Sequence, residues 1–208
     1  MSAYGRRSAG GGKLVAVAIL AALLAAYAKA ASHGTADAAR HGGAGSGASG
    51  YVNPLAGQRW TLARTDQGVD YRPAVPEPVR AIGAGTVVYS STADCPPSGW
   101  PACAVIGYRL TSGPKADHVI YVAEHLSGLL PRGASVRAGE RIATALPGYP
   151  WTEWGWADCT GSAPAVHYNG AADGTPMPGG LAFARFMREL GAATAQDPGP
   201  GPDVVRSC

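Results

Sequence analysis

Hydrophobic residues downstream of Tyr51 follow the pattern of short β-strands. Runs rich in Val, Ile, Tyr and Thr are interrupted by Gly, Pro, Asp and Ser at intervals of roughly eight to twelve residues, which is typical of an antiparallel sandwich or barrel. The pattern predicts strands at 59–64, 69–71, 85–91, 104–111, 118–126, 135–145 and 152–157.

Two stretches refine this picture. Residues 118–126 (HVIYVAEHL) are almost continuously apolar, as expected for a strand that is covered on both faces. Helical spacing occurs later, at Leu181, Phe183, Phe186, Met187 and Leu190, and stops at Gly191. The predicted fold is therefore mostly β: a compact antiparallel β-sandwich or barrel-like core with a short C-terminal helix.

The N-terminal residues have a different pattern. Residues 1–30 combine basic residues, an apolar run of about 15 residues, shorter than the ~20 of a spanning helix, and A-x-A sequences. This predicts a signal peptide, with an N-terminal membrane anchor as the alternative. Residues 31–50 are small and polar and predict a flexible Gly/Ala/Ser linker. We expect the domain at 51–192, an extended tail at 193–208, and a secreted or cell-envelope location.

Composition adds constraints on partners. The formal net charge is +3, but four of the 17 basic residues and none of the 14 acidic residues lie in residues 1–30. The remainder has 13 basic and 14 acidic residues, a net charge of −1. Without a basic excess, nucleic-acid binding is not expected.

All four cysteines lie in the part that is predicted to be exported, where an even number usually forms disulfides. Three pairings are possible. Cys95 with Cys103 would close a short loop, and Cys159 with Cys208 would attach the C-terminal tail to the domain. The second closes the longer loop and should stabilise more. No C-x2-C spacing favours a zinc–thiolate site.

A weak internal repeat is visible in two phrases, residues 78–88 (PVRAIGAGTVV) and 133–143 (GASVRAGERIA). Each runs an apolar pair into a glycine turn and back into a strand. The pattern predicts a tight bend between two short antiparallel strands in each phrase.

Four phrases in order resemble the M23 (lysostaphin-type) peptidase family, whose core is a duplicated hybrid motif. They are DQGVDY from Asp66, PVRAIGAGTV from Pro78, YVAEHLS from Tyr121 together with 133–143, and TEWGWA from Thr152. The resemblance covers about residues 58–157. It implies a cell-wall peptidase-like β domain with peptidoglycan or another cell-envelope polymer as partner.

The resemblance also implies site residues. Active members hold zinc with a His and an Asp four residues apart and with the second His of an H-x-H, while further histidines orient the attacking water. In this sequence Asp66 stands at the first ligand position, Asp70 matches the Asp, and His125 matches a catalytic His. Glu153 and Gly155 stand in place of H-x-H, so the zinc site is degenerate.

Two interpretations of these acids remain open. Asp66, Asp70 and Glu153 could converge as metal ligands or as acid/base groups acting on a glycan, with His125 and Glu153 as the catalytic candidates. Alternatively, the two aspartates cap turns and Glu153 pairs with Arg64 or Arg109. We expect no bound cofactor; zinc or another divalent cation is the alternative.

Clustered aromatic residues suggest a polymer-binding surface. Tyr149, Trp151 and Trp154 lie close together in the sequence, and their flat faces could stack on sugar rings, although core packing explains them equally well. The leading hypothesis is an exported, catalytically degenerate M23-like domain that binds peptidoglycan or another envelope polymer. The alternative is an active wall hydrolase, a metallopeptidase or a carboxylate-based glycan hydrolase, built on Asp66, Asp70, His125 and Glu153. A third hypothesis is an interaction scaffold without either property.

Overall fold

The protein divides into two compact units, residues 1–43 and 44–208. The computed structural model describes residues 50–92, 104–148, 151–166, 172–194 and 205–208, all in the second unit. The predictions for residues 1–30 and 31–49, for Cys95 and Cys103, and for Tyr149 lie outside the described residues. Among the described residues, no helix has the length and hydrophobicity needed to cross a membrane.

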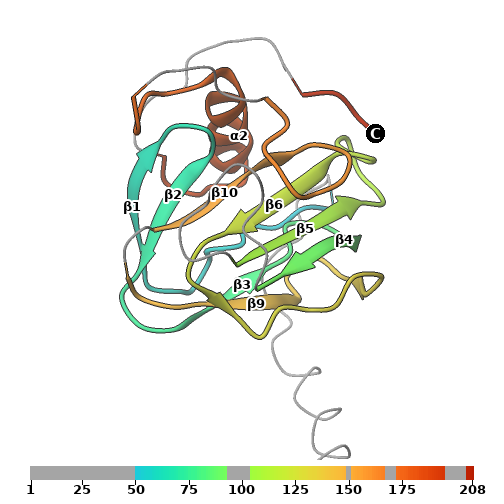
Figure 1. Ribbon diagram of the computed structural model, residues 1–208, viewed down its shortest axis with the longest axis horizontal. Helices are drawn as coiled ribbons and strands as arrows, with labels where there is room; N and C mark the ends of the chain where they lie inside the picture. Colours follow the sequence, from blue (N-terminus) through green and yellow to red (C-terminus); the bar gives the residue numbers. More distant parts are fainter. Residues whose placement is uncertain (1–49, 93–103, 149–150, 167–171, 195–204) are drawn as a thin grey trace, which may run out of the picture. The chain divides into compact units, whose positions relative to one another are not determined.

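Two antiparallel sheets and one helix make up the described domain (Figure 1). The larger sheet has seven strands in the order β1-β2-β10-β6-β5-β4-β8, and the smaller has three in the order β3-β9-β7. The strands are β1 (Trp60–Thr65), β2 (Val69–Pro73), β3 (Glu77–Arg80), β4 (Gly85–Ser91), β5 (Val105–Leu110), β6 (Val119–Ala123), β7 (Leu126–Ser127), β8 (Ser135–Val136), β9 (Arg141–Ala145) and β10 (Thr152–Ala157). The mostly β prediction is confirmed, and within the described residues the sheets do not close into a barrel.

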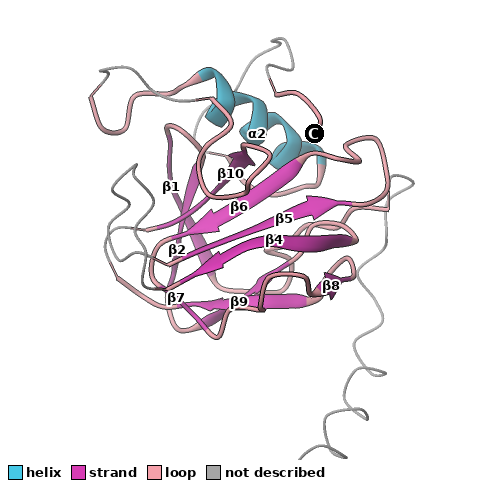
Figure 2. Ribbon diagram, turned by 45° about the vertical axis from the view of Figure 1, so that its right-hand side comes forward, coloured by secondary structure: helices cyan, strands magenta, loops and turns pink. Residues whose placement is uncertain are grey.

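The predicted C-terminal helix is also confirmed as α2 (Pro178–Glu189). Its first residue is proline, which suits a position whose N–H has no helical partner. It ends before Gly191, whose φ of 81° is readily adopted by glycine. The helix packs on β10, β1 and β2 at one end of the larger sheet (Figure 2).

The two faces of the larger sheet have different partners. In β5, Ile106, Tyr108 and Leu110 belong to the main core, which also contains residues of the smaller sheet and of α2. The alternate residues of β5 face the other way, because side chains alternate along a strand. Val105 joins Val119, Tyr121, Ala123 and Ala157 in a second, smaller apolar cluster. We call this second side the outer face.

Two predicted strands are interrupted. The prediction of one strand at 118–126 is wrong at its end, because Glu124 and His125 have φ values of 71° and 47° and separate β6 from β7. The stretch 135–145 is divided into β8 and β9 by a turn at Gly139, with φ 79°. No separate strand was predicted at β3, most of which belongs to the repeated phrase 78–88.

The two repeated phrases have an arrangement that the sequence did not predict. We expected each to form its own bend between two strands that pair with one another. Instead, the first phrase supplies β3 and β4, the second supplies β8 and β9, and β3 pairs with β9 while β4 pairs with β8. Each phrase therefore connects the two sheets, and the strands of one phrase pair with the strands of the other in both sheets.

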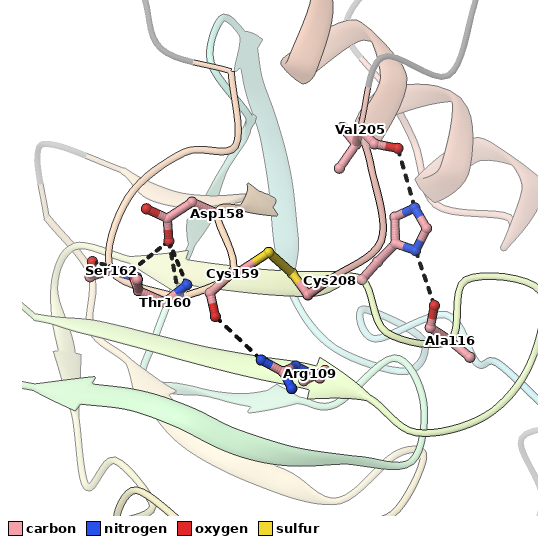
Figure 3. Close-up of a disulfide and its surroundings, with 10 residues drawn as sticks. Arg109, Ala116, Asp158, Cys159, Thr160, Ser162, Val205 and Cys208 are labelled. Atoms are coloured by element: carbon pink, nitrogen blue, oxygen red, sulfur yellow. Dashed lines mark hydrogen bonds between the residues drawn. A yellow bond between two sulfur atoms is a disulfide. The ribbon is translucent and has the colours of Figure 1, made fainter.

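The C-terminal residues are attached to the domain by several contacts. Cys159 and Cys208 form the disulfide that was one of the predicted pairings, with Cα atoms 5.4 Å apart (Figure 3). The Cys208 amide donates to the Asp117 carbonyl at 2.9 Å, and a ring nitrogen of His118 lies 3.3 Å from the Val205 carbonyl oxygen. His118 is therefore a structural residue that holds the tail.

Candidate functional site

Three acidic side chains from neighbouring strands meet on the outer face of the larger sheet. Asp70 in β2 is paired with Glu153 in β10, and Asp66 lies in the turn before β2. One carboxylate oxygen from each residue lies within 4.8 Å of the others, and all three residues are buried. The structure thus brings together the acids that the sequence singled out, and we call them the acidic cluster.

The acidic cluster contains its own cation. Arg64 in β1 is paired with Asp70; its Nε donates to Asp70 Oδ2 at 2.6 Å, and an NH2 nitrogen lies 3.0 Å from Asp66 Oδ2. The same guanidinium reaches Asp173 in the loop before α2 at 2.9 Å. Arg64 therefore pairs with the aspartates, and not with Glu153 as the alternative interpretation expected.

Glu153 has different partners. The Tyr121 hydroxyl in β6 donates a short hydrogen bond to Glu153 Oε1, and Glu153 is also hydrogen-bonded to Asp66. The groups form a continuous chain from the Tyr121 hydroxyl through Glu153 and Asp66 to the Arg64 guanidinium.

Burial raises the pKa of several acids in this region. It is the largest cause that raises the pKa of Asp70 to about 7 and that of Glu124 to about 8, with further increases from neighbouring carboxylates and an opposing effect of Arg64. Burial and the contact with Asp66 hold the pKa of Glu153 well above its usual range. The raised pKa values favour the neutral forms of Glu153 and Glu124 near neutral pH.

His125 lies apart from these acids. It follows β6 in a left-handed conformation, and its imidazole packs on Gly148, where an added Cβ would come within 2.4 Å of the ring. Among the described residues, the acidic cluster consists of Asp66, Asp70 and Glu153 and does not include His125. Its predicted catalytic role therefore stays a prediction that has no supporting contact with Glu153.

The aromatic candidates have different environments. Trp154 is fully buried and packs edge-on against Trp60, so its ring presents no surface to a ligand. Trp151 is only partly buried, with the guanidinium carbons of Arg72 and Arg64 at 4.2 Å and 5.3 Å from its ring centre. Of these two tryptophans, Trp151 is the one placed at the edge of the acidic cluster.

The residues present do not fit the zinc that the family resemblance implies. The donor set is three carboxylates, which suit harder cations, and Arg64 already donates to oxygens of both aspartates. At Gly155, in place of the second histidine of H-x-H, an added Cβ would lie 2.5 Å from Cε1 of the Tyr121 ring. The space that a ligand side chain would need is filled by the Tyr121 ring.

A substitution at Gly155 tests this packing. Gly155→Ala is expected to lower the free energy of unfolding by about 1–3 kcal/mol, because the new methyl group overlaps the buried Tyr121 ring. Urea denaturation would show a lower midpoint with an unchanged slope. Gly179→Ala is the matched control, because its Cβ would have ordinary contacts at 3.4 Å or more. If Gly155→Ala behaved like the control, the tyrosine would not fill this space.

No family model matches the chain, and no curated protein matches it. Among solved structures, it is similar to lysostaphin in solution, with 18% identity, a TM-score of 0.47 and coverage of 76% of this chain and 62% of that chain. It is likewise similar to the antimicrobial peptidase lysostaphin from Staphylococcus simulans, with 16% identity, a TM-score of 0.46 and coverage of 75% and 61%. The chain thus spans about three fifths of the length of these proteins.

Proposed function

We propose that this protein is an exported M23-like domain that binds peptidoglycan or another cell-envelope polymer and is not a zinc peptidase. The observation that carries the proposal is the position of Arg64, which bonds to Asp66 and Asp70 where the family pattern calls for metal. A guanidinium supplies positive charge permanently but cannot activate water as a Lewis acid.

Polymer binding rests on the order of the four sequence phrases and on Trp151. This side chain is partly exposed beside the acidic cluster, and the guanidinium groups of Arg72 and Arg64 lie over its ring at 4.2 and 5.3 Å from the ring centre. Such a ring is pre-oriented, and stacking on a sugar would cost little side-chain entropy.

Purified sacculi provide the binding test. The full exported chain is expected to sediment with sacculi, and Trp151→Ala is expected to weaken binding about tenfold, as truncation of an anchoring tryptophan typically costs more than 1 kcal/mol. Leu146→Ala is the control, since Leu146 is an exposed large apolar residue that is not part of the acidic cluster. Absence of binding by the unmodified chain would contradict the proposal.

Elemental analysis tests the second half of the proposal. After dialysis against zinc and then against buffer, the domain is expected to retain far less than one equivalent of zinc. Stoichiometric zinc that is lost in Asp70→Ala would show that a metal displaces Arg64, and would make the protein a peptidase candidate.

A carboxylate-based hydrolase is the second candidate. It is favoured by the raised pKa of Glu153, because a buried carboxylic acid that stays protonated near neutral pH is the general acid used in glycoside hydrolysis. Clearing of wall suspensions by the unmodified chain, with loss of clearing in Glu153→Gln and in Asp70→Asn, would favour this candidate over the binding domain.

A further inference from the structure

A second candidate site lies on the outer face at the opposite end of the larger sheet. An open pocket of about 650 Å³ is bounded by β4, β5, the turn before β8 and the loop that contains Cys159. Figure 3 shows Arg109 of β5 directed at this loop. The polar lining of the pocket consists mainly of two arginines and four hydroxyl side chains: Arg109, Arg132, Thr86, Tyr89, Thr160 and Ser162.

Arg109 has unused hydrogen-bonding capacity. Its Nε is buried and has no hydrogen-bond partner among the described residues, and its NH2 group donates only a long bond, 3.4 Å, to the Cys159 carbonyl. A buried donor without an acceptor is costly. A carboxylate or phosphate would satisfy it, because two oxygens of such a group match neighbouring N–H donors of a guanidinium.

The charge of the pocket is positive. Arg132 is an exposed second cation, and none of the lining residues in the described part of the chain is acidic. Asp158 precedes the lining residue Cys159, but its Oδ1 accepts from the amides of Thr160 and Gly161 at 2.9 and 3.0 Å. This carboxylate therefore organises the loop, and it forms no ion pair with Arg109 among the described residues.

The wall of the pocket is fixed before any ligand arrives. Gly161 packs directly on Gly107 of β5, where an added Cβ on Gly107 would come within 2.3 Å of the Gly161 carbonyl oxygen. The disulfide from Cys159 to Cys208 holds the same loop covalently. A preformed wall reduces the entropy that a ligand must overcome on binding.

We propose that this pocket is an oxyanion-binding site, in which Arg109 and Arg132 take a carboxylate or phosphate group carried by a larger ligand. The hydroxyl groups of Thr86 and Tyr89 are further donors in the lining, whereas the Thr160 hydroxyl already donates to Asp158 Oδ1 at 2.6 Å and is hydrogen-bonded to the Ser162 hydroxyl. This site is separate from the acidic cluster, and its existence does not depend on the proposed binding of wall polymer.

Titration of the folded, disulfide-bonded chain with small anions tests the proposal. The arginine Nε–Hε signals and the amides of Thr160 and Ser162 would be followed by NMR with sodium phosphate, with sodium acetate, and with sodium chloride at equal ionic strength. We expect saturable shifts of the Arg109 signal and of both amides with phosphate or acetate and not with chloride. Saturation by one anion alone identifies the group; absence of saturation by both overturns the proposal.

Three variants give the contribution of each arginine. Arg109→Gln is expected to weaken binding of the saturating anion about tenfold or more, as loss of a charge-assisted pair does. Arg132→Gln is expected to weaken it about threefold, because Arg132 is exposed. Arg137→Gln is the control, since Arg137 is exposed but does not line the pocket. If Arg109→Gln does not fold, Arg132→Gln alone decides. Equal weakening by Arg137→Gln and Arg132→Gln would overturn the site in favour of general surface charge.

Discussion

Arg64→Met is expected to lower the free energy of unfolding by about 3 kcal/mol at pH 7, because it leaves buried carboxylates without their cation. Arg64 is the only cation in the ion pairs found for Asp66, Asp70 and Asp173 among the described residues. The loss should be smaller at pH 4.5, where the carboxyl groups are more fully protonated. Chemical denaturation at both pH values measures the difference.

Two controls separate the role of charge from that of side-chain size. Arg64→Lys keeps the charge but not the fork of donors and should be intermediate. Arg59→Met removes a largely exposed ion pair with Glu77, whose arginine side chain is 72% exposed, and should cost less than about 1 kcal/mol. If Arg64→Met were no worse than Arg59→Met, the acidic cluster would not depend on Arg64.

The same variant should acquire a metal response. Without the guanidinium, three carboxylates within 4.8 Å of one another offer oxygen ligands to a hard divalent cation. Excess Mn²⁺ is therefore expected to raise the melting temperature of Arg64→Met and to leave the unmodified chain unchanged, as binding to the folded state alone stabilises it. Equal stabilisation of both proteins would show that Arg64 does not compete with a cation.

The stability of the unmodified chain is expected to fall as the pH rises from about 4.5 to 8. Glu153, Glu124 and Asp70 have raised pKa values in the folded state, with values of about 8 for Glu124 and about 7 for Asp70. The unfolded chain loses these protons near pH 4, so over this interval the folded state binds more protons. Each such group contributes a slope of about 1.4 kcal/mol per pH unit, and this stabilisation is lost as the pH passes the folded pKa.

Urea denaturation at a series of pH values measures that slope, which reports the total number of protons and not their individual sites. Glu153→Gln should reduce the slope by the contribution of about one proton, because the glutamine side chain has the shape of glutamate but no titrating proton. Glu189→Gln, on the exposed end of α2, is the matched control. Stability that rose with pH would mean that the buried acids are ionised in the folded state.

Local patterns predicted most of the secondary structure and part of the acidic cluster. Alternation and β-branched content marked β4 and β10 at their observed bounds, and helical spacing marked α2 up to Gly191. The order of the phrases led us to expect that Asp66, Asp70 and Glu153 could converge, and the structure places them together. Their chemical role remains a prediction.

The remaining features depend on contacts between distant residues. Nothing local indicates that Arg64 turns toward the aspartates or that Tyr121 covers Gly155, because both follow from the register of β1, β2, β10 and β6. The pocket at Arg109 likewise requires the loop after β10 to lie on Gly107. Once the register of β10 and β6 is known, Gly155 opposite Tyr121 indicates that the tyrosine ring covers the glycine.

The strand order has a consequence for how the domain can change. Arg109 lies in β5 and Asp70 in β2, with β6 and β10 between them, so three strand spacings, about 14 Å, separate the two groups across the sheet. Energetic effects at this separation are usually additive. Either end of the outer face can therefore be remodelled or inactivated with little penalty at the other, which makes the domain a modular platform with two independently adjustable positions.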